Sequence, residues 1–169
     1  MNFTLGKEVY KCYQQELLAL SKRLTSLKKR LTGLIDKDAK TYLLIVRAYK
    51  LPSNTERENN LRKIKIQEAL KKSTLVTLDI LTYSQQALSL SKRLLEIGNK
   101  NLISDVGVGA CMLEAGIKGA LLNIEINLTS IKDVRFINDI SIRSKNLVNE
   151  AKKIAYYVIT ETSKRMLKK

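Results

Sequence analysis

The sequence predicts an all-α fold, a multihelical bundle built from long helices. Over long stretches, apolar residues recur at steps of four and three, as they do along one face of an α-helix, and no segment shows the period of two expected of a strand. The 169 residues include a single proline. We therefore expect roughly nine tenths of the chain to be helical, in one domain spanning residues 1–169.

The first helix is expected from about residue 8 to residue 50, which is roughly 60 Å if the helix is unbroken. Leu51-Pro52 should end it, because the residue before a proline is disfavoured in the α region. Its apolar seam comprises Tyr13, Leu17, Leu20, Leu24, Leu27, Leu31, Leu34, Tyr42, Ile45 and Tyr49.

The second helix should begin after Thr55 and run towards Gly98. Thr55 and Glu58 have the spacing of a capping box, and Gly98 is a suitable C-terminal cap after "RLLEI". Hydroxyl and β-branched residues cluster at 73–77, so we expect a break or bend there.

The third helix is expected to begin at Ser104 as N-cap, with Asp105 favoured by the positive end of the helix dipole. It contains four of the seven glycines, each of which costs a helix roughly 0.5 to 1 kcal/mol relative to alanine. One face is expected to point inward, small in the middle and polar at both ends: Asp105, Gly109, Met112, Gly116, Gly119, Asn123 and Asn127. Close helix packing explains the glycines alone. It does not explain Asn123 and Asn127, whose buried amides would need partners such as a ligand.

Asp133 is expected to cap the last helix. Its seam again has the four-and-three spacing, at Ile137, Ile140, Ser144, Leu147, Ala151, Ile154, Val158 and Thr162.

Composition restricts the chemistry. The net charge of +15 favours anionic partners, namely nucleic acid, acidic lipid or a polyanionic small molecule.

There is no histidine, which excludes His-based metal sites and triads. Cys12 and Cys111 suggest neither a disulfide framework nor a thiolate zinc site. These features fit a reducing cytoplasm. No apolar run approaches the roughly 18 residues of a membrane span, so no membrane partner is expected.

Two further residues are candidates for chemistry. Asp38 follows Leu34 on the apolar seam, where partial desolvation would raise the pKa of a carboxyl group and suit it to acid or base work. A structural carboxylate paired with a lysine explains it equally well. Lys50 lies at the first helix end, where it could meet an anionic ligand.

Several segments, taken in order along the chain, resemble the cyclodeaminase/cyclohydrolase family. They are "FTLGKEVY" at 3–10, "DKDAKTYLLIVRAYKLP" at 36–52, "IQEALK" at 66–71, "GNKNLISDVGVGA" at 98–110 and "GALLNIEINLTSIKD" at 119–133. This family includes the cyclodeaminase domain of formiminotransferase-cyclodeaminase and bacterial methenyltetrahydrofolate cyclohydrolases.

The resemblance implies a helical bundle that forms a homodimer and acts on a tetrahydrofolate derivative without a metal or redox cofactor. The reaction would be either closure of 5-formiminotetrahydrofolate to the 5,10-methenyl compound with loss of ammonia, or hydrolysis of the methenyl bridge to the 10-formyl compound. Asp38, Asp105 and Lys50 are the catalytic candidates. The substrate-binding candidates are Tyr49, Asn101, Ser104, Asn123 and Asn127. The positive charge would also suit a polyglutamylated folate.

One feature departs from the family pattern. A glycine- and alanine-rich helix precedes the "TLGK" region in the family, whereas Met1 falls here where that helix would be ending. This leaves a catalytically inactive or truncated relative, acting as a helical interaction module, as the alternative function. A nucleic-acid binder, which the charge alone suggests, is expected least and would show steeply salt-dependent affinity.

Overall fold

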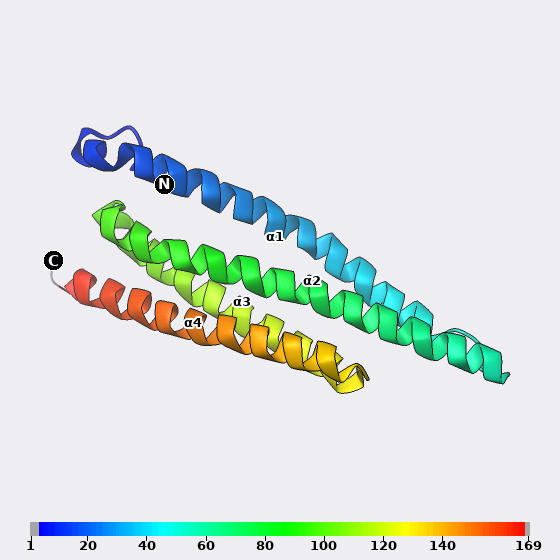
Figure 1. Ribbon diagram of the computed structural model, residues 1–169. Helices are drawn as coiled ribbons and strands as arrows, with labels where there is room; N and C mark the ends of the chain where they lie inside the picture. Colours follow the sequence, from blue (N-terminus) through cyan, green and yellow to red (C-terminus); the bar gives the residue numbers. More distant parts are fainter. Residues whose placement is uncertain (1–3, 168–169) are drawn as a thin grey trace.

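Four long helices lie alongside one another in the computed structural model, which describes residues 4–167 (Figure 1). The all-α fold class is confirmed. In chain order the elements are a 3₁₀ turn η1 (Glu8–Tyr13), α1 (Gln14–Tyr49), α2 (Glu56–Ile97), a short 3₁₀ turn η2 (Lys100–Leu102), α3 (Ile103–Ser130) and α4 (Val134–Leu167).

Helix α1 packs on α2 through a strict seven-residue repeat. Its buried residues Leu20, Leu27, Leu34, Thr41 and Ala48 are each seven apart, the spacing that keeps one seam facing a partner helix. The expected seam is confirmed from Leu17 to Leu34 and at Ile45, and it is wrong at its three tyrosines, of which Tyr13 is 39% exposed. Tyr42 and Tyr49 are 63% and 47% exposed, because the repeat continues to Thr41 and Ala48 and turns the tyrosines outward.

Helix α2 begins at the predicted capping box. The Thr55 side chain accepts a hydrogen bond from the Glu58 backbone N–H at 3.2 Å, and the Glu58 carboxylate accepts one from the Thr55 N–H at 3.0 Å. The expected break at 73–77 is wrong, because α2 is continuous there. The hydroxyls of Thr74 and Thr77 instead bond back to carbonyls of their own helix, at 2.8 and 3.1 Å.

Asparagine and aspartate side chains organise the starts of the last two helices. Ser104 is not the predicted N-cap, because η2 precedes α3 and the Asn99 side chain caps that turn. Asp133 does cap α4 as predicted, accepting from the Phe136 N–H at 3.1 Å. The ammonium of Lys71 and this N–H together lower the pKa of Asp133 below its ordinary value.

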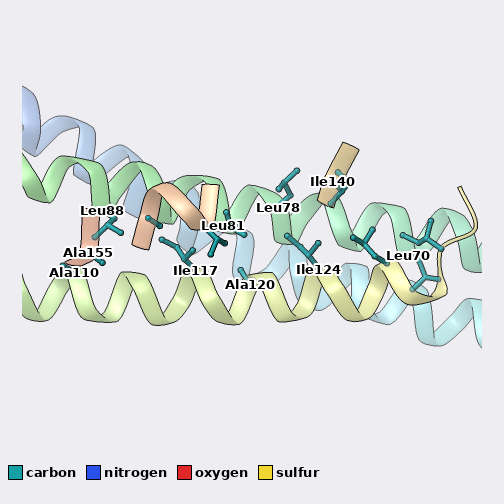
Figure 2. Packing of buried hydrophobic residues seen from close by; sticks show 14 of the residues in the cluster. Leu70, Leu78, Leu81, Leu88, Ala110, Ile117, Ala120, Ile124, Ile140 and Ala155 are labelled. Carbon is teal, nitrogen blue, oxygen red and sulfur yellow. The ribbon is translucent and has the colours of Figure 1, made fainter. Parts of the chain in front are cut away.

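The main core lies where α2, α3 and α4 meet (Figure 2). It joins Leu81 and Leu88 of α2 to Ile117 and Ile124 of α3 and to Ile140 of α4, all fully or almost fully buried. Burying one such side chain contributes about 1.5 to 3 kcal/mol. A second cluster joins leucines of α1 to Ala87, Leu90 and Ile97 of α2, so α2 is the central helix.

The predicted inward face of α3 is wrong. Gly116, Gly119 and Asn123 are exposed, and Met112 is 71% exposed, while the other side of the helix enters the core through Ala110, Ile117 and Ile124. Apart from the adjacent residues and the backbone of α3 itself, no atom of the described chain lies within 4 Å of a β-carbon built on Gly109, Gly116 or Gly119. Neighbouring side chains therefore do not fill the space above these three glycines. The space lies on the outside of the chain and is not enclosed in its core.

The segment Lys100–Ser130 is long and apolar enough, by length and composition, to cross a membrane. Its most apolar window has a mean hydropathy of 1.2 and is 28% buried within the chain. The expectation that no run approaches a span is thus wrong for α3. A core helix of a soluble bundle gives the same weak signal, and α3 does contribute to the core.

Candidate functional site

A cleft of about 150 Å³ lies where α2 connects to α3, and we call it the connection cleft. It holds one of the candidate catalytic carboxylates, Asp105, at its margin. Its lining consists of Thr4, Leu94, Gly98, Asn99, Leu102, Asp105 and Val106. Apolar walls with a few polar groups are typical of small-molecule sites.

Asn99 fixes the shape of the connection. Its side-chain oxygen accepts hydrogen bonds from the Asn101 backbone N–H at 3.0 Å and from the Tyr10 hydroxyl at 3.4 Å. These contacts tie η1 and the start of α3 to the end of α2. Sequence reasoning missed Asn99, although an asparagine directly after a helix-ending glycine is a common turn signal.

A larger cleft of about 470 Å³ adjoins the first and shares Leu94, Gly98, Asn99 and Val106 with it. Arg165 of α4 closes one side. Its guanidinium donates to the Leu95 carbonyl at 2.9 Å and to the Glu161 carboxylate at 2.9 Å. Arg165 was also missed, because it lies at least 59 residues from the cleft's other lining residues and only the packing of α4 brings it there.

Asp38 lies half-buried on α1, in the seven-residue series that continues from Leu31 to Ile45. Its expected place on the seam is confirmed. The buried Thr41 hydroxyl donates to the Asp38 carbonyl at 2.9 Å. Ile45 of this series packs against the main core.

The two asparagines of α3 differ in their surroundings. The Asn127 amide is half-buried and donates to the Ser73 hydroxyl of α2 at 3.5 Å, whereas Asn123 is exposed. Asn127 therefore has the hydrogen-bond partner that a buried amide needs. That partner is the Ser73 side chain of the same protein and not a ligand.

Asp38 and Asn127 lie beside neighbouring stretches of α2. The Lys37 ammonium, adjacent to Asp38, is 3.9 Å from the Asp79 carboxylate of α2, while Asn127 contacts Ser73. Ser73 and Asp79 are six residues apart, about 9 Å along a helix. We call Asp38, Asn123 and Asn127 the mid-bundle residues.

Tyr49 and Lys50 lie at the far end of α1, both exposed. The Tyr49 carbonyl accepts from the Arg62 guanidinium at 2.9 Å, and the Lys50 backbone N–H closes the last turn. Eleven residues separate Tyr49 from Asp38, about 16 Å along the helix.

The structure does not gather all the candidate residues in one place. Asp105 lines the connection cleft, whereas Asn101 and Ser104 are exposed residues that neighbour its lining residues in the sequence. Asp105 and Asn127 are twenty-two residues apart on one continuous helix, about 33 Å. Within one chain, the acid at the cleft and the mid-bundle amides cannot contact the same atoms of a ligand.

The sequence matches the family model described as formiminotransferase-cyclodeaminase over residues 1–146. It is 34% identical over 150 residues to a methenyltetrahydrofolate cyclohydrolase of Methylorubrum extorquens, a match that covers 89% of this chain and 72% of that protein. It is 35% identical over 130 residues to the formimidoyltransferase-cyclodeaminase of Rattus norvegicus, covering 77% of this chain but 24% of the rat protein.

The fold is similar to the crystal structure of formiminotetrahydrofolate cyclodeaminase from Thermotoga maritima. The TM-score is 0.84 at 24% sequence identity, and the match covers 98% of this chain and 78% of that one. At this identity the likeness shows the fold alone.

Proposed function

Because the chain belongs to the formiminotransferase-cyclodeaminase family, we propose that it is a folate one-carbon enzyme acting on the bridge between N5 and N10 of tetrahydrofolate. The reaction is either cyclodeamination of 5-formiminotetrahydrofolate to 5,10-methenyltetrahydrofolate or hydrolysis of that product to 10-formyltetrahydrofolate. The observation that carries the proposal is the 34% identity to a cyclohydrolase over 89% of the chain.

Both reactions pass through a tetrahedral carbon between two nitrogens and need a proton delivered to a leaving group. In this proposal Asp105 serves as one proton-transfer group, because it borders a cleft whose other walls include Leu94, Leu102 and Val106. Asp38 is the second candidate, since it is a half-buried carboxylate on an otherwise apolar seam.

The amides and the end of α1 are assigned to binding. Asn101 and Ser104 lie next to the connection cleft, and Asn123 and Asn127 offer amides to the edge of a flat heterocycle. Tyr49 and Lys50 would contact the anionic glutamate end of folate, and the net charge of +15 supports a polyglutamylated tail. Neither reaction changes an oxidation state, so the proposal requires no redox cofactor, and it includes no metal.

We also propose that the enzyme is a cytoplasmic homodimer. Cys12 and Cys111 are both exposed, unpaired thiols, which are stable in a reducing compartment. A second copy would cover apolar side chains that α3 leaves in solvent.

The test is the absorbance of methenyltetrahydrofolate. Purified chain is supplied with 5-formiminotetrahydrofolate, and separately with the methenyl compound at a pH where its spontaneous hydrolysis is slow. Formation above the uncatalysed rate indicates a cyclodeaminase, and accelerated loss indicates a cyclohydrolase. Flat traces with both substrates, from a chain that is folded by circular dichroism, would favour the alternative of an inactive interaction module.

A further inference from the structure

The far end of α4 lies at the end of the bundle where α2 connects to α3 (Figure 1). It belongs to the part of the chain that follows residues 1–146, which the family model matches. Arg165, in the last turn of α4, contacts α2 here, because its Nη1 atom donates to the Leu95 carbonyl at 2.9 Å. Arg165 thus reaches the candidate site from outside the matched region.

This contact supplies a donor to the end of α2. The last four carbonyls of an α-helix have no partner within the helix, and those of α2 belong to residues 94–97. The Leu94 carbonyl accepts from the Gly98 backbone N–H at 2.9 Å, and the next carbonyl, that of Leu95, accepts from Arg165. A cation is also favoured at the negative end of the helix dipole. Arg165 therefore stabilises the last turn of α2.

Gly98 sets the direction in which the chain leaves that turn. A β-carbon at Gly98 would lie 2.5 Å from the Leu94 carbonyl oxygen, and the Gly98 backbone is extended, with φ −75° and ψ 173°. Asn99 follows directly, and its side chain accepts from the Asn101 N–H at 3.0 Å. Asp105 comes four residues after Asn101, in the first turn of α3. A shift of the last turn of α2 would therefore also move Asp105.

Glu161 holds the Arg165 guanidinium in place. Its carboxylate, one turn earlier on α4, accepts from the Nε atom of Arg165 at 2.9 Å, while Nη1 donates to Leu95. The side chains of Glu161 and Arg165 are 28% and 35% exposed, so the pair is partly shielded from water. A charge-assisted hydrogen bond in such a setting restricts the rotamers of Arg165 and directs its remaining donors towards α2.

We infer that Arg165 is a positioning residue for the candidate active site: by holding the last turn of α2, it keeps the Asp105 carboxylate at the connection cleft. This rests on the proposed function, in which Asp105 transfers a proton. Arg165 lines the larger cleft, which shares four lining residues with the connection cleft, so both clefts depend on the same turn. Proton transfer needs a group within hydrogen-bond reach of the reacting atom, and a misplacement of about 1 Å can cost about a hundredfold in rate.

Turnover measurements test this role. Arg165→Met keeps a long side chain but removes the donors, and we expect kcat to fall about tenfold to a hundredfold with little change in KM. Arg165→Lys returns one donor and should recover part of kcat. Lys164→Met removes the neighbouring, exposed cation of α4 and is the matched control, with kcat and KM unchanged. An unchanged kcat in Arg165→Met, or a rise in KM alone, would overturn the positioning role.

Amide hydrogen exchange tests the structural step without reference to activity. The backbone N–H groups of Gly98 and Leu102 are each hydrogen-bonded at 2.9 Å within the connection, and that of Asn59 is bonded at 2.9 Å at the other end of α2. In Arg165→Met we expect the first two to exchange about tenfold faster than in Lys164→Met, and Asn59 to exchange equally in both. Equal exchange at all three would show that the turn holds without Arg165 and would overturn the inference.

The two measurements separate this inference from the proposed function. An inactive wild type would refute the proposed function. In that case faster exchange at Gly98 and Leu102 would still show that Arg165 holds the end of α2. An active wild type whose connection exchanges equally in the two variants would refute the inference and leave the proposed function standing.

Discussion

The Cγ2 atom of Thr162 lies 2.9 Å from the position that a β-carbon on Gly107 would occupy. Gly107 on α3 and Thr162 on α4 are both buried, so the missing side chain lets these two helices approach closely. Of the four glycines of α3, Gly107 is the one whose β-carbon would meet a neighbouring helix, because the other three have open space there.

We expect Gly107→Ala to lower the free energy of unfolding by about 1 to 2 kcal/mol, because overpacking against a β-branched side chain outweighs the gain in helix propensity. Urea unfolding measures it. Adding Thr162→Ser removes the Cγ2 atom and should restore part of the loss. Full stability of the single variant would show that α4 yields to the added methyl group.

Gly119→Leu should separate folding from association. The added side chain meets no atom of the described chain within 4 Å of its β-carbon and replaces a poor helix former, so the melting temperature of the monomer should rise. The same side chain would obstruct a second copy that covers this surface of α3, and sedimentation should show a shift towards monomer. Gly33→Leu, at an equally open position on α1, is the control and should leave association unchanged. A dimer that survives Gly119→Leu would show that the second copy does not cover this surface of α3.

The capping box of α2 should be worth about 1 kcal/mol. Thr55→Ala removes the acceptor for the Glu58 N–H, and we expect the free energy of unfolding to fall by that amount. Asn54→Ala is the matched control, because Asn54 contributes its backbone N–H to Glu58 and an alanine keeps that group. Equal losses in the two variants would mean that the hydroxyl contributes nothing specific.

The ion pair between Glu16 and Arg93 gives the fold an acid-sensitive contact. The Arg93 guanidinium donates to both Glu16 oxygens, at 2.7 and 2.8 Å, and lowers the pKa of that carboxyl group from its ordinary value of 4.5. A carboxyl with a lowered pKa stabilises the fold at pH values above 4.5, and this contribution is lost as the pH falls through the folded value.

The free energy of unfolding should therefore fall more steeply below pH 4.5 in the wild type than in Glu16→Gln. At neutral pH the difference between the two proteins should shrink as salt is added, because both groups are exposed to solvent. Parallel pH profiles would show that the pair is equally formed in the unfolded chain.

Asp38→Asn should reduce turnover by about a hundredfold to ten-thousandfold if Asp38 transfers a proton, with little effect on folding. Asp36→Asn is the control, because Asp36 is exposed and lies two residues away on a different side of α1. Unchanged turnover in Asp38→Asn would assign Asp38 to structure.

Only part of the candidate site was visible in the sequence. Asp38 could be recognised because a carboxylate interrupts a regular apolar seam. Asp105 could be recognised because it lies in the segment at 98–110 that resembles the family. Arg165 could not be found in this way, since its place at the cleft depends on where the far end of α4 packs.

The sequence by itself determined where α1 ends, where α2 and α4 begin, and which side of α4 and most of the side of α1 are buried. The helix ends depend on contacts within a few residues, namely the caps at Thr55 and Asp133 and the steric effect of Pro52. A seven-residue apolar repeat likewise marks one face of a helix for burial, whichever helix packs against it. Only the tertiary structure decided which side of α3 enters the core. That helix is apolar or small on almost every side, so its periodicity favours no single face, and packing against α2 and α4 makes the choice.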